Sequence, residues 1–536
     1  MPESKNTSKV PIMVSAIGII LCLVQIWLPA YYPNCDGPCH LANATAIADI
    51  WKHGVQSFYS KFYTINYSPD PNWLNEIILA LLQHLFSYVV AEKVLLSGYV
   101  VLMLTGSIRL VRIVGGGTFY WLPAFFLVIF HNAVPQGFYN FSFSIGLYMH
   151  LVALWLLWLQ EKRWSYALSF PLLLAFTYFS HPVSFVFGCI TCGALWLTHT
   201  MAVWKTRAER KHMLSSVFLL AGAVVPFLLM FLAFANRYGG VEEIKIQFMP
   251  ERFKTIISLK HLVNYSHKEE DTLVITGIAL MLLCLYLIYS RIRMKITIHR
   301  FDGFLITFIF ALVVYFVLPD SMLNGGYFTL RAAIFSTLLL LICCSYVTKH
   351  SSGSLVAGLS LFAAFTVLFF IRMPVTMAAA DIIKEHMEVR PFIRKGAVVA
   401  PFTYDTWGRA RNGKVICSRN NIFCHMAQYL SDIHDVLVLD NFEANTGYFP
   451  LLWRPELDPF VHLARWPGFQ AVPPAADIAA YEEKTGIVVD YVLFMNFDSS
   501  FTKFNTSEQL VKEVRQNYHV TYASATGRTI LYSRNQ

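Results

Sequence analysis

The clearest chemical pattern in the sequence is Asp-Gly-Pro-Cys-His at residues 36–40, in a long segment between two apolar runs. Pro38 suits the first turn of a helix and Gly54 a helix end, so a short helix is predicted to begin just after Asp36. The positive end of that helix would keep the Asp36 carboxylate ionised, and such a carboxylate can act as a general base. The alternative interpretation is that Asp36 only caps the helix. His40 falls within its first two turns.

Aromatic residues follow this segment and suit either of two roles. Their rings can stack on sugars, but aromatic belts also mark the membrane boundary of many proteins. His84, further along the chain, is interpreted either as a cavity residue or as an ordinary hydrogen-bonded one. The aromatic residues are Phe58, Tyr59, Phe62, Tyr63 and Tyr67.

Composition indicates a membrane protein. Of the 536 residues, 56% are hydrophobic and only 14% are charged, whereas a soluble protein is about a quarter charged. Nucleic-acid binding, fibrous structure and disorder are therefore excluded as the main function.

Eleven apolar runs are predicted to span a membrane. Residues 73–90 are left out because Glu76, Gln83 and His84 form a polar stripe on one helical face, which favours a helix lying in the membrane interface. The predicted spans are residues 10–28, 94–111, 118–134, 140–160, 165–181, 184–204, 214–235, 272–290, 301–319, 329–348 and 354–371.

Basic residues set the predicted orientation. With residues 73–90 outside the bilayer, the basic segments between spans all fall on the side of the N-terminus, which is the cytoplasmic side by the positive-inside rule. Residues 30–93 and everything after residue 372 are then extracytoplasmic. The basic residues are Lys5, Lys9, Arg109, Arg112, Lys162, Arg163, Lys205, Arg207, Arg210, Lys211, Arg291, Arg293, Lys295, Arg300 and Lys349.

The predicted spans contain few ionisable residues. Asp302, Arg331 and Arg372 are expected at span ends, and His150 well inside. Ion-coupled transporters carry charged residues within their spans, so a proton- or sodium-coupled transporter is disfavoured.

Composition changes near residue 373. Residues 1–372 are predicted to form the transmembrane domain and residues 373–536 a soluble extracytoplasmic α/β domain, a length sufficient for one core. Strands are predicted at residues 397–402, 435–439, 487–495, 519–522 and 529–532, and helices near 475–484 and 507–518.

Four of the ten cysteines lie outside the predicted spans. Cys35 with Cys39, and Cys417 with Cys424, are close enough in sequence to pair in an oxidising compartment, although spacing does not fix connectivity. Their spacing is not of zinc type, so a metal site is the weaker interpretation.

The order of these features resembles the integral-membrane glycosyltransferases of the C superfamily (GT-C). The shared features are a first span, a long outer loop opening with an acidic motif, a short helix ending at residues 51–54, and a Pro/Asn-led interfacial helix. The resemblance implies a polytopic α-helical membrane protein of about eleven spans with a C-terminal α/β domain. It also implies a polyprenyl-phosphate sugar donor, with Asp36 as the catalytic base.

The next outer loop departs from part of that superfamily. Some members carry a second acid there, whereas residues 131–136 contain none. The lack of a second acid disfavours a metal-dependent mechanism. No residue is predicted as a metal ligand, and no cofactor is predicted with certainty. A divalent metal cofactor is the alternative. His131 in this loop is interpreted either as a supporting residue or as an ordinary hydrogen-bonded one.

The chemistry of such a transfer needs a cation facing the lipid phosphate, because the phosphate departs with extra negative charge. Arg331 is the candidate, because it follows a Gly325-Gly326 turn at the outer end of a span and its guanidinium fork suits phosphate. The alternatives are that it extends to the membrane interface or pairs with Asp320. The predicted substrate-binding residues are His40, Arg331, His131, His84 and Tyr63.

The predicted function is inverting transfer of a sugar from a polyprenyl-phosphate donor to a glycan, lipid or protein acceptor, on the outer face of a bacterial inner membrane. Asp36 would deprotonate the acceptor. The alternative is a non-catalytic lipid or polysaccharide transport or envelope-assembly component, which needs no carboxylate in the first outer loop.

Overall fold

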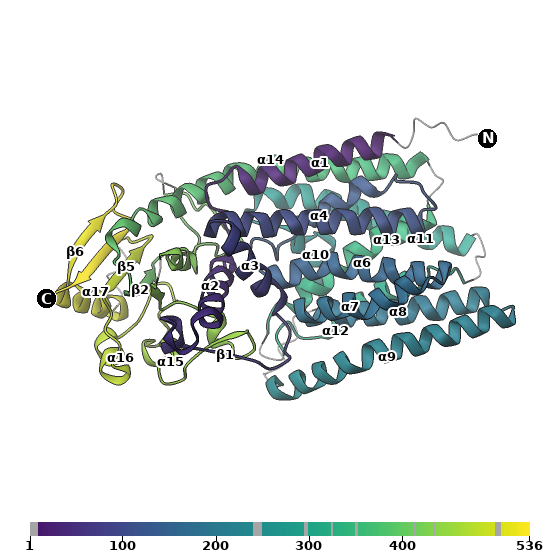
Figure 1. The fold of residues 1–536 in the computed structure, drawn as a ribbon. Coiled ribbons are helices and arrows are strands. Elements are labelled where there is room, and N and C mark those ends of the chain that lie inside the picture. Colours follow the sequence, from purple (N-terminus) through teal and green to yellow (C-terminus); the bar gives the residue numbers. More distant parts are fainter. Residues whose placement is uncertain are drawn as a thin grey trace.

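The computed structural model describes residues 9–239, 249–293, 298–322, 325–348, 352–410, 413–433, 435–498 and 505–535. It has two parts: a bundle of long helices and an α/β region at one end of the bundle (Figure 1). The first helix, α1, begins at the opposite end of the bundle from the α/β region.

Within the described ranges, eight helices are long and apolar enough to cross a membrane. Two shorter helices, α7 (Trp164–Ser180) and α12 (Gly303–Val317), lie in the same bundle (Figure 1). These ten helices coincide with ten of the eleven predicted spans, and the eight long ones confirm the prediction of a polytopic helical membrane protein. The eight are α1 (Lys9–Trp27), α4 (Tyr88–Val114), α6 (Tyr139–Glu161), α8 (Pro182–Val203), α9 (Arg207–Tyr238), α11 (Lys268–Arg293), α13 (Phe328–Val347) and α14 (Ser352–Met387).

The prediction of a continuous helix at residues 118–134 is wrong. This segment contains only the 3₁₀ helix η3 (Leu122–Phe125) and one turn of α-helix, α5 (Phe126–Ile129). Irregular backbone is tolerated at membrane depth where protein surrounds it, and here Arg372 donates a hydrogen bond to the Phe130 carbonyl at 3.1 Å. The segment still connects the two ends of the bundle, because α4 ends at one and α6 begins at the other (Figure 1).

The last long helix, α14, extends well beyond the predicted end of its span. It continues through residue 372 to Met387, so Arg372 lies inside a helix and not at a span end. Its side chain is buried and pairs with Glu269 at 2.8 Å. Glu269 also accepts the backbone N–H groups of residues 264–266, so the ion pair fixes the chain before α11 against α14.

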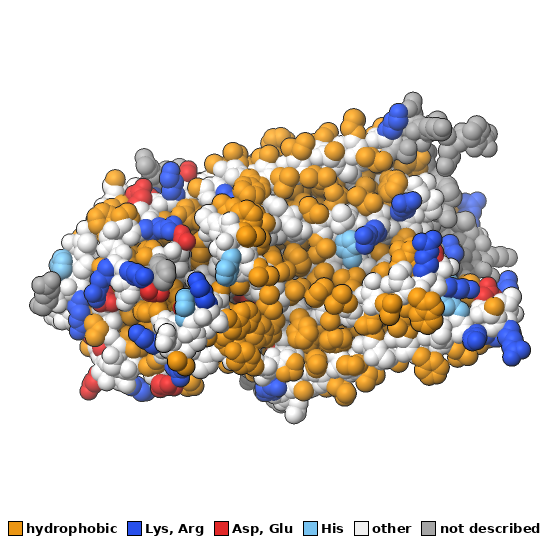
Figure 2. Space-filling view, in the orientation of Figure 1, with side chains coloured by type: hydrophobic (Ala, Val, Ile, Leu, Met, Phe, Trp, Pro, Cys, Tyr) orange, Lys and Arg blue, Asp and Glu red, His pale blue; other side chains and the backbone are white. Residues whose placement is uncertain are grey.

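Lys and Arg residues gather at the end of the bundle where α1 begins. Figure 2 shows hydrophobic side chains over the middle of the bundle, Lys and Arg at its right-hand end, and mixed charges on the α/β region. The chain therefore runs in the predicted direction, while the assignment of this end to the cytoplasm stays a prediction. Lys5, Lys295 and Lys349 lie outside the described residues.

The helix predicted to lie in the interface is α3 (Leu74–Leu85), which is shorter than predicted because α4 begins at Tyr88. Two residues of its polar stripe face the protein, since Glu76 is buried and Gln83 donates to the Leu41 carbonyl at 3.0 Å, whereas the third, His84, is exposed. Its apolar residues Leu81 and Leu85 are exposed.

The α/β region contains a five-stranded mixed sheet with strand order β3-β2-β5-β7-β6. β2 pairs in parallel with β3 and β5 and is buried along its whole length, as expected of a central strand. β5 and β6 each pair antiparallel with β7. The five predicted strands and both predicted helices are present as β2 (Val398–Thr403), β3 (Leu437–Val438), β5 (Tyr491–Met495), β6 (Tyr518–Ala523), β7 (Ile530–Arg534), α16 (Ile478–Thr485) and α17 (Asn505–Asn517).

The first outer loop packs as part of this α/β region. Its strand β1 (Tyr63–Ile65) pairs antiparallel with β4 (Leu451–Trp453). Ala46 and Ile47, in α2 (Gly37–His53), belong to the same hydrophobic core as the central sheet. The start of α2, where Asp36 lies, is therefore fixed against the α/β region.

Candidate active site

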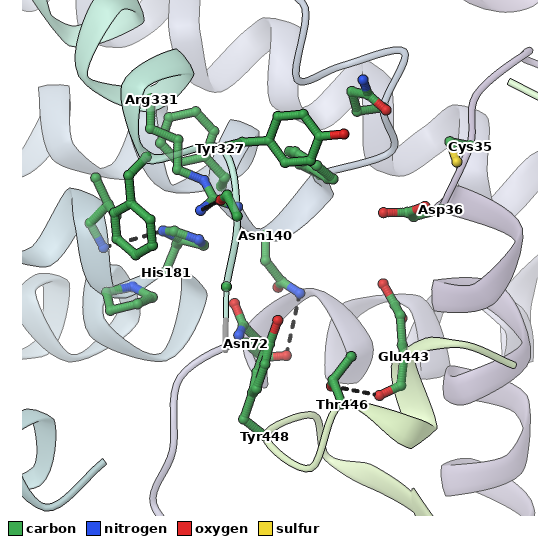
Figure 3. Close-up of a pocket in the computed structure, with 18 of the residues that line it drawn as sticks. Cys35, Asp36, Asn72, Asn140, His181, Tyr327, Arg331, Glu443, Thr446 and Tyr448 are labelled. Atoms are coloured by element: carbon green, nitrogen blue, oxygen red, sulfur yellow. Dashed lines mark hydrogen bonds between the residues drawn. The ribbon is translucent and has the colours of Figure 1, made fainter. Parts of the chain in front are cut away.

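A cavity of about 750 Å³ lies where the helix bundle meets the α/β region. It is lined by the start of α2, the loop before α6, parts of α8, α9, α12 and α13, and segments of the α/β region. Aromatic residues of the bundle, including Phe141, Phe187 and Phe310, give it an apolar part. Figure 3 shows Asp36 on one side of the cavity and Arg331 with His181 on the other.

The Asp36 carboxylate faces the cavity and does not cap α2. Asp36 occupies the N-cap position without a side-chain cap bond; the cap is Asn34, whose Oδ1 accepts the Gly37 N–H at 2.6 Å. The interpretation of Asp36 as a mere helix cap is therefore wrong.

Residues 135–137 of the second outer loop pack against the backbone around Asp36. The N–H groups of Cys35 and Asp36 donate to the carbonyls of Pro135 and Gln136 at 3.0 and 3.1 Å. Gly137 has a φ of +82°, and a Cβ atom there would lie 2.4 Å from the Gly37 nitrogen. Close backbone packing, available only to glycine, thus positions the carboxylate.

His40 lies behind Asp36, between two carboxylates. Its Nδ1 is 2.6 Å from Glu76 Oε1 and its Nε2 3.1 Å from Glu443 Oε1. Burial alone would lower the pKa of His40, but the charges of Glu443 and Glu76 outweigh it and raise the pKa to about 9. His40 is thus held as an imidazolium that lines the cavity and joins α2 to α3 and to the α/β region.

Arg331 presents its guanidinium to the cavity. Nη1 donates to the Gly326 carbonyl at 2.6 Å, and the group lies over the rings of Phe138 and Phe141 at 5.3 and 5.5 Å. Among the described residues it forms no ion pair, and Asp320, its partner in the alternative interpretation, accepts from Thr329 instead. Interaction with aromatic faces leaves donors of the guanidinium for a ligand.

The other predicted substrate-binding residues do not line the cavity. His84 faces a backbone carbonyl of its own helix at 2.7 Å. His131 is fully buried beside the Tyr99 hydroxyl at 3.3 Å. Tyr63 is buried against Trp453, with ring centroids 4.3 Å apart. His84 and His131 are therefore hydrogen-bonded residues outside the cavity, and Tyr63 is a core residue of the α/β region that belongs neither to the cavity nor to a membrane-boundary belt.

Neither predicted cysteine pair forms a disulfide. All four outer cysteines are free, and Cys35 lies beside Cys424. The hydrogen bond from Cys35 is the largest cause that lowers the pKa of Cys424 to about 6, with His425 also favouring the thiolate against burial. The pairing prediction failed because folding brings together cysteines from two distant segments.

Three groups of described residues have the spacing of metal ligands. In one group, His40 pairs directly with both Glu76 and Glu443, which accounts for their closeness. The other two groups share His425: one adds Cys35 and Cys424, and the other adds Cys39 and Asp440.

Known proteins resemble this chain in fold and not in sequence. No family model and no curated protein sequence matches the chain. The arabinofuranosyltransferase AftD from Mycobacteria, solved as a mutant, superposes with a TM-score of 0.50 and 13% identity, over 99% of this chain and 42% of AftD. The chain thus shares its fold with this arabinofuranosyltransferase, as the resemblance to membrane glycosyltransferases led us to expect.

Two structures of the oligosaccharyltransferase AglB from Archaeoglobus fulgidus are also similar. The apo form gives a TM-score of 0.48 over 100% of this chain, and the complex with an inhibitory peptide and a dolichol-phosphate gives 0.49 over 99%. Both are 12% identical and are covered over 75% of their length.

Proposed function

We propose that this protein is an inverting membrane glycosyltransferase in which Asp36 is the general base and Arg331 binds the phosphate of a polyprenyl-phosphate sugar. One observation carries the proposal: the Asp36 carboxylate, which does not cap α2, faces the same cavity as the Arg331 guanidinium, which has no carboxylate partner in the part of the chain that the structure describes. The fold shared with an arabinofuranosyltransferase supports sugar transfer as the reaction class.

The cavity suits a donor with a lipid tail. Its apolar part, with Phe141, Phe187 and Phe310, would pack against the first units of a polyprenyl chain. Arg331 lies over aromatic rings beside that part, where it would meet the phosphate. The sugar would then extend toward Asp36.

In the reaction, an acceptor hydroxyl or amine attacks the anomeric carbon from the face opposite the phosphate. Its proton passes to the Asp36 carboxylate as the new bond forms. The bond between the anomeric carbon and the phosphate oxygen breaks, and its electron pair leaves with the polyprenyl phosphate. Arg331 faces the negative charge that develops there, and the anomeric configuration inverts.

Residues at the α/β end of the bundle line the cavity, and Lys and Arg residues gather at the opposite end (Figure 2). By the positive-inside rule the α/β end is extracytoplasmic, so transfer would occur on the outer face.

The test is transfer from radiolabelled polyprenyl-phosphate sugars in membranes that contain wild-type protein or Asp36→Asn at equal amounts. We expect Asp36→Asn to lower the rate by about 10²–10⁴-fold, the usual contribution of a general base. Asp49→Asn is the matched control, because Asp49 lies in the same helix and bonds His53 and Ser57. Unchanged transfer by Asp36→Asn would remove Asp36 as the base. Absence of transfer by the wild type, with lipid-linked saccharide crossing the vesicles, would favour the transport alternative.

A further inference from the structure

Two cysteines and a histidine from distant parts of the chain meet beside the cavity. Cys35 lies in the turn before α2, whereas Cys424 and His425 directly precede the 3₁₀ helix η6 (Met426–Asp432). Their sulfur and imidazole nitrogen atoms all lie within 4.8 Å of one another. Zinc binds sulfur at about 2.3 Å and imidazole nitrogen at about 2.0 Å, so small side-chain rotations bring all three atoms to one ion.

The imidazole of His425 is oriented as a ligand requires. Its Nδ1 lies 3.3 Å from Asp440 Oδ1, and its Nε2 points toward Asp36, 3.9 Å from Oδ1. His425 and Asp440 are both buried, at 4% and 3% exposure. A carboxylate on the second nitrogen of a ligating histidine fixes the ring and increases its basicity.

The proposed transfer reaction does not use these residues. A disulfide between Cys35 and Cys424 would explain two sulfurs side by side. It would not explain why an imidazole, with a buried carboxylate behind it, converges on the same two sulfurs.

We propose that Cys35, Cys424 and His425 bind a zinc ion, with Asp440 bonded to the second nitrogen of His425. Thiolate and imidazole ligands favour zinc over the hard cations magnesium and calcium. On binding, each thiol releases its proton to solvent. The ion would join the turn that carries Asp36 to the α/β region, and Asp36 lies beside the remaining coordination position.

The first measurement is the metal content of full-length protein, purified in detergent without chelators, by inductively coupled plasma mass spectrometry. We expect about one zinc ion per chain in the wild type and a loss of at least about tenfold in Cys35→Ser and Cys424→Ser. Cys417→Ser is the matched control, because Cys417 is buried in the same region but belongs to neither ligand group. Its zinc content should equal that of the wild type.

A second measurement needs no variant, so it decides the question even where a substitution prevents folding. Wild-type protein stripped of zinc should bind cobalt and show thiolate-to-cobalt charge-transfer absorption. The proposal is overturned by wild-type protein that lacks both zinc and this absorption, or by a Cys35–Cys424 disulfide in a non-reducing peptide map. Neither measurement requires a sugar donor, so the result is independent of the proposed glycosyl transfer.

Discussion

Asn34 accepts the backbone N–H of Gly37 through Oδ1 at 2.6 Å and thereby caps α2 in place of Asp36. The amide nitrogen of Asn34 donates to Glu92 Oε1 at 3.0 Å, which ties the cap to α4. Because a neighbouring residue provides the cap, the Asp36 carboxylate can face the cavity without leaving the helix end unsatisfied.

This arrangement predicts that Asn34→Ala destabilises the protein by about 1 kcal/mol through loss of the cap. Asn34→Asp keeps an acceptor for Gly37 but places a second negative charge beside the buried Glu92, so it should destabilise more. Thermal unfolding in detergent measures both. Equal unfolding temperatures for Asn34→Ala and the wild type would show that the cap contributes no stability.

Gly137→Ala should reduce both transfer and stability, because the added methyl group would lie 2.4 Å from the Gly37 nitrogen and displace the turn around Asp36. Gly117→Ala is the matched control: its φ is also positive, at +92°, but no atom lies within 4 Å of the new methyl. We expect loss of transfer in Gly137→Ala and near-normal transfer in Gly117→Ala. Similar transfer activities in the two variants would show that the close packing of Gly137 does not position Asp36.

Arg331→Met should lower kcat by about 10²–10³-fold, the usual effect of removing one donor to a developing negative charge. Arg331→Lys should recover part of the rate, because lysine keeps the charge but loses the planar fork. Arg293→Met, at the opposite end of the bundle, controls for loss of a basic residue. Steady-state kinetics with saturating donor provide the measurement, and a wild-type kcat in Arg331→Met would exclude the phosphate role.

Arg372→Met should destabilise the protein by about 3–5 kcal/mol, because it leaves the Glu269 carboxylate buried without its cation. It also removes the donors to the Phe130 and Leu262 carbonyls. Arg372→Lys keeps the positive charge, so its free energy of unfolding should lie between those of Arg372→Met and the wild type. Urea or thermal unfolding in detergent measures the stability of the three proteins. Equal stability would contradict the predicted role of the ion pair.

The sequence by itself determined most of the long helices and the strands of the central sheet, because hydropathy is a property of neighbouring residues. The long apolar runs of the bundle and the short apolar runs of the sheet, such as residues 397–402, were therefore predicted correctly. Residues 118–134 show the limit: their hydropathy is that of a span, but donors such as Arg372, distant in sequence, replace the helical hydrogen bonds.

Only the tertiary structure decided which side chains share the site. Asp36 and Arg331 were candidates from the sequence through their position at segment ends, whereas Glu443 and His425 were not. Asn43 and Glu443 bond to each other across 400 residues of sequence, and Cys35 meets Cys424 in the same way. Such contacts depend on how the first outer loop packs against the α/β region, and no local pattern encodes that packing.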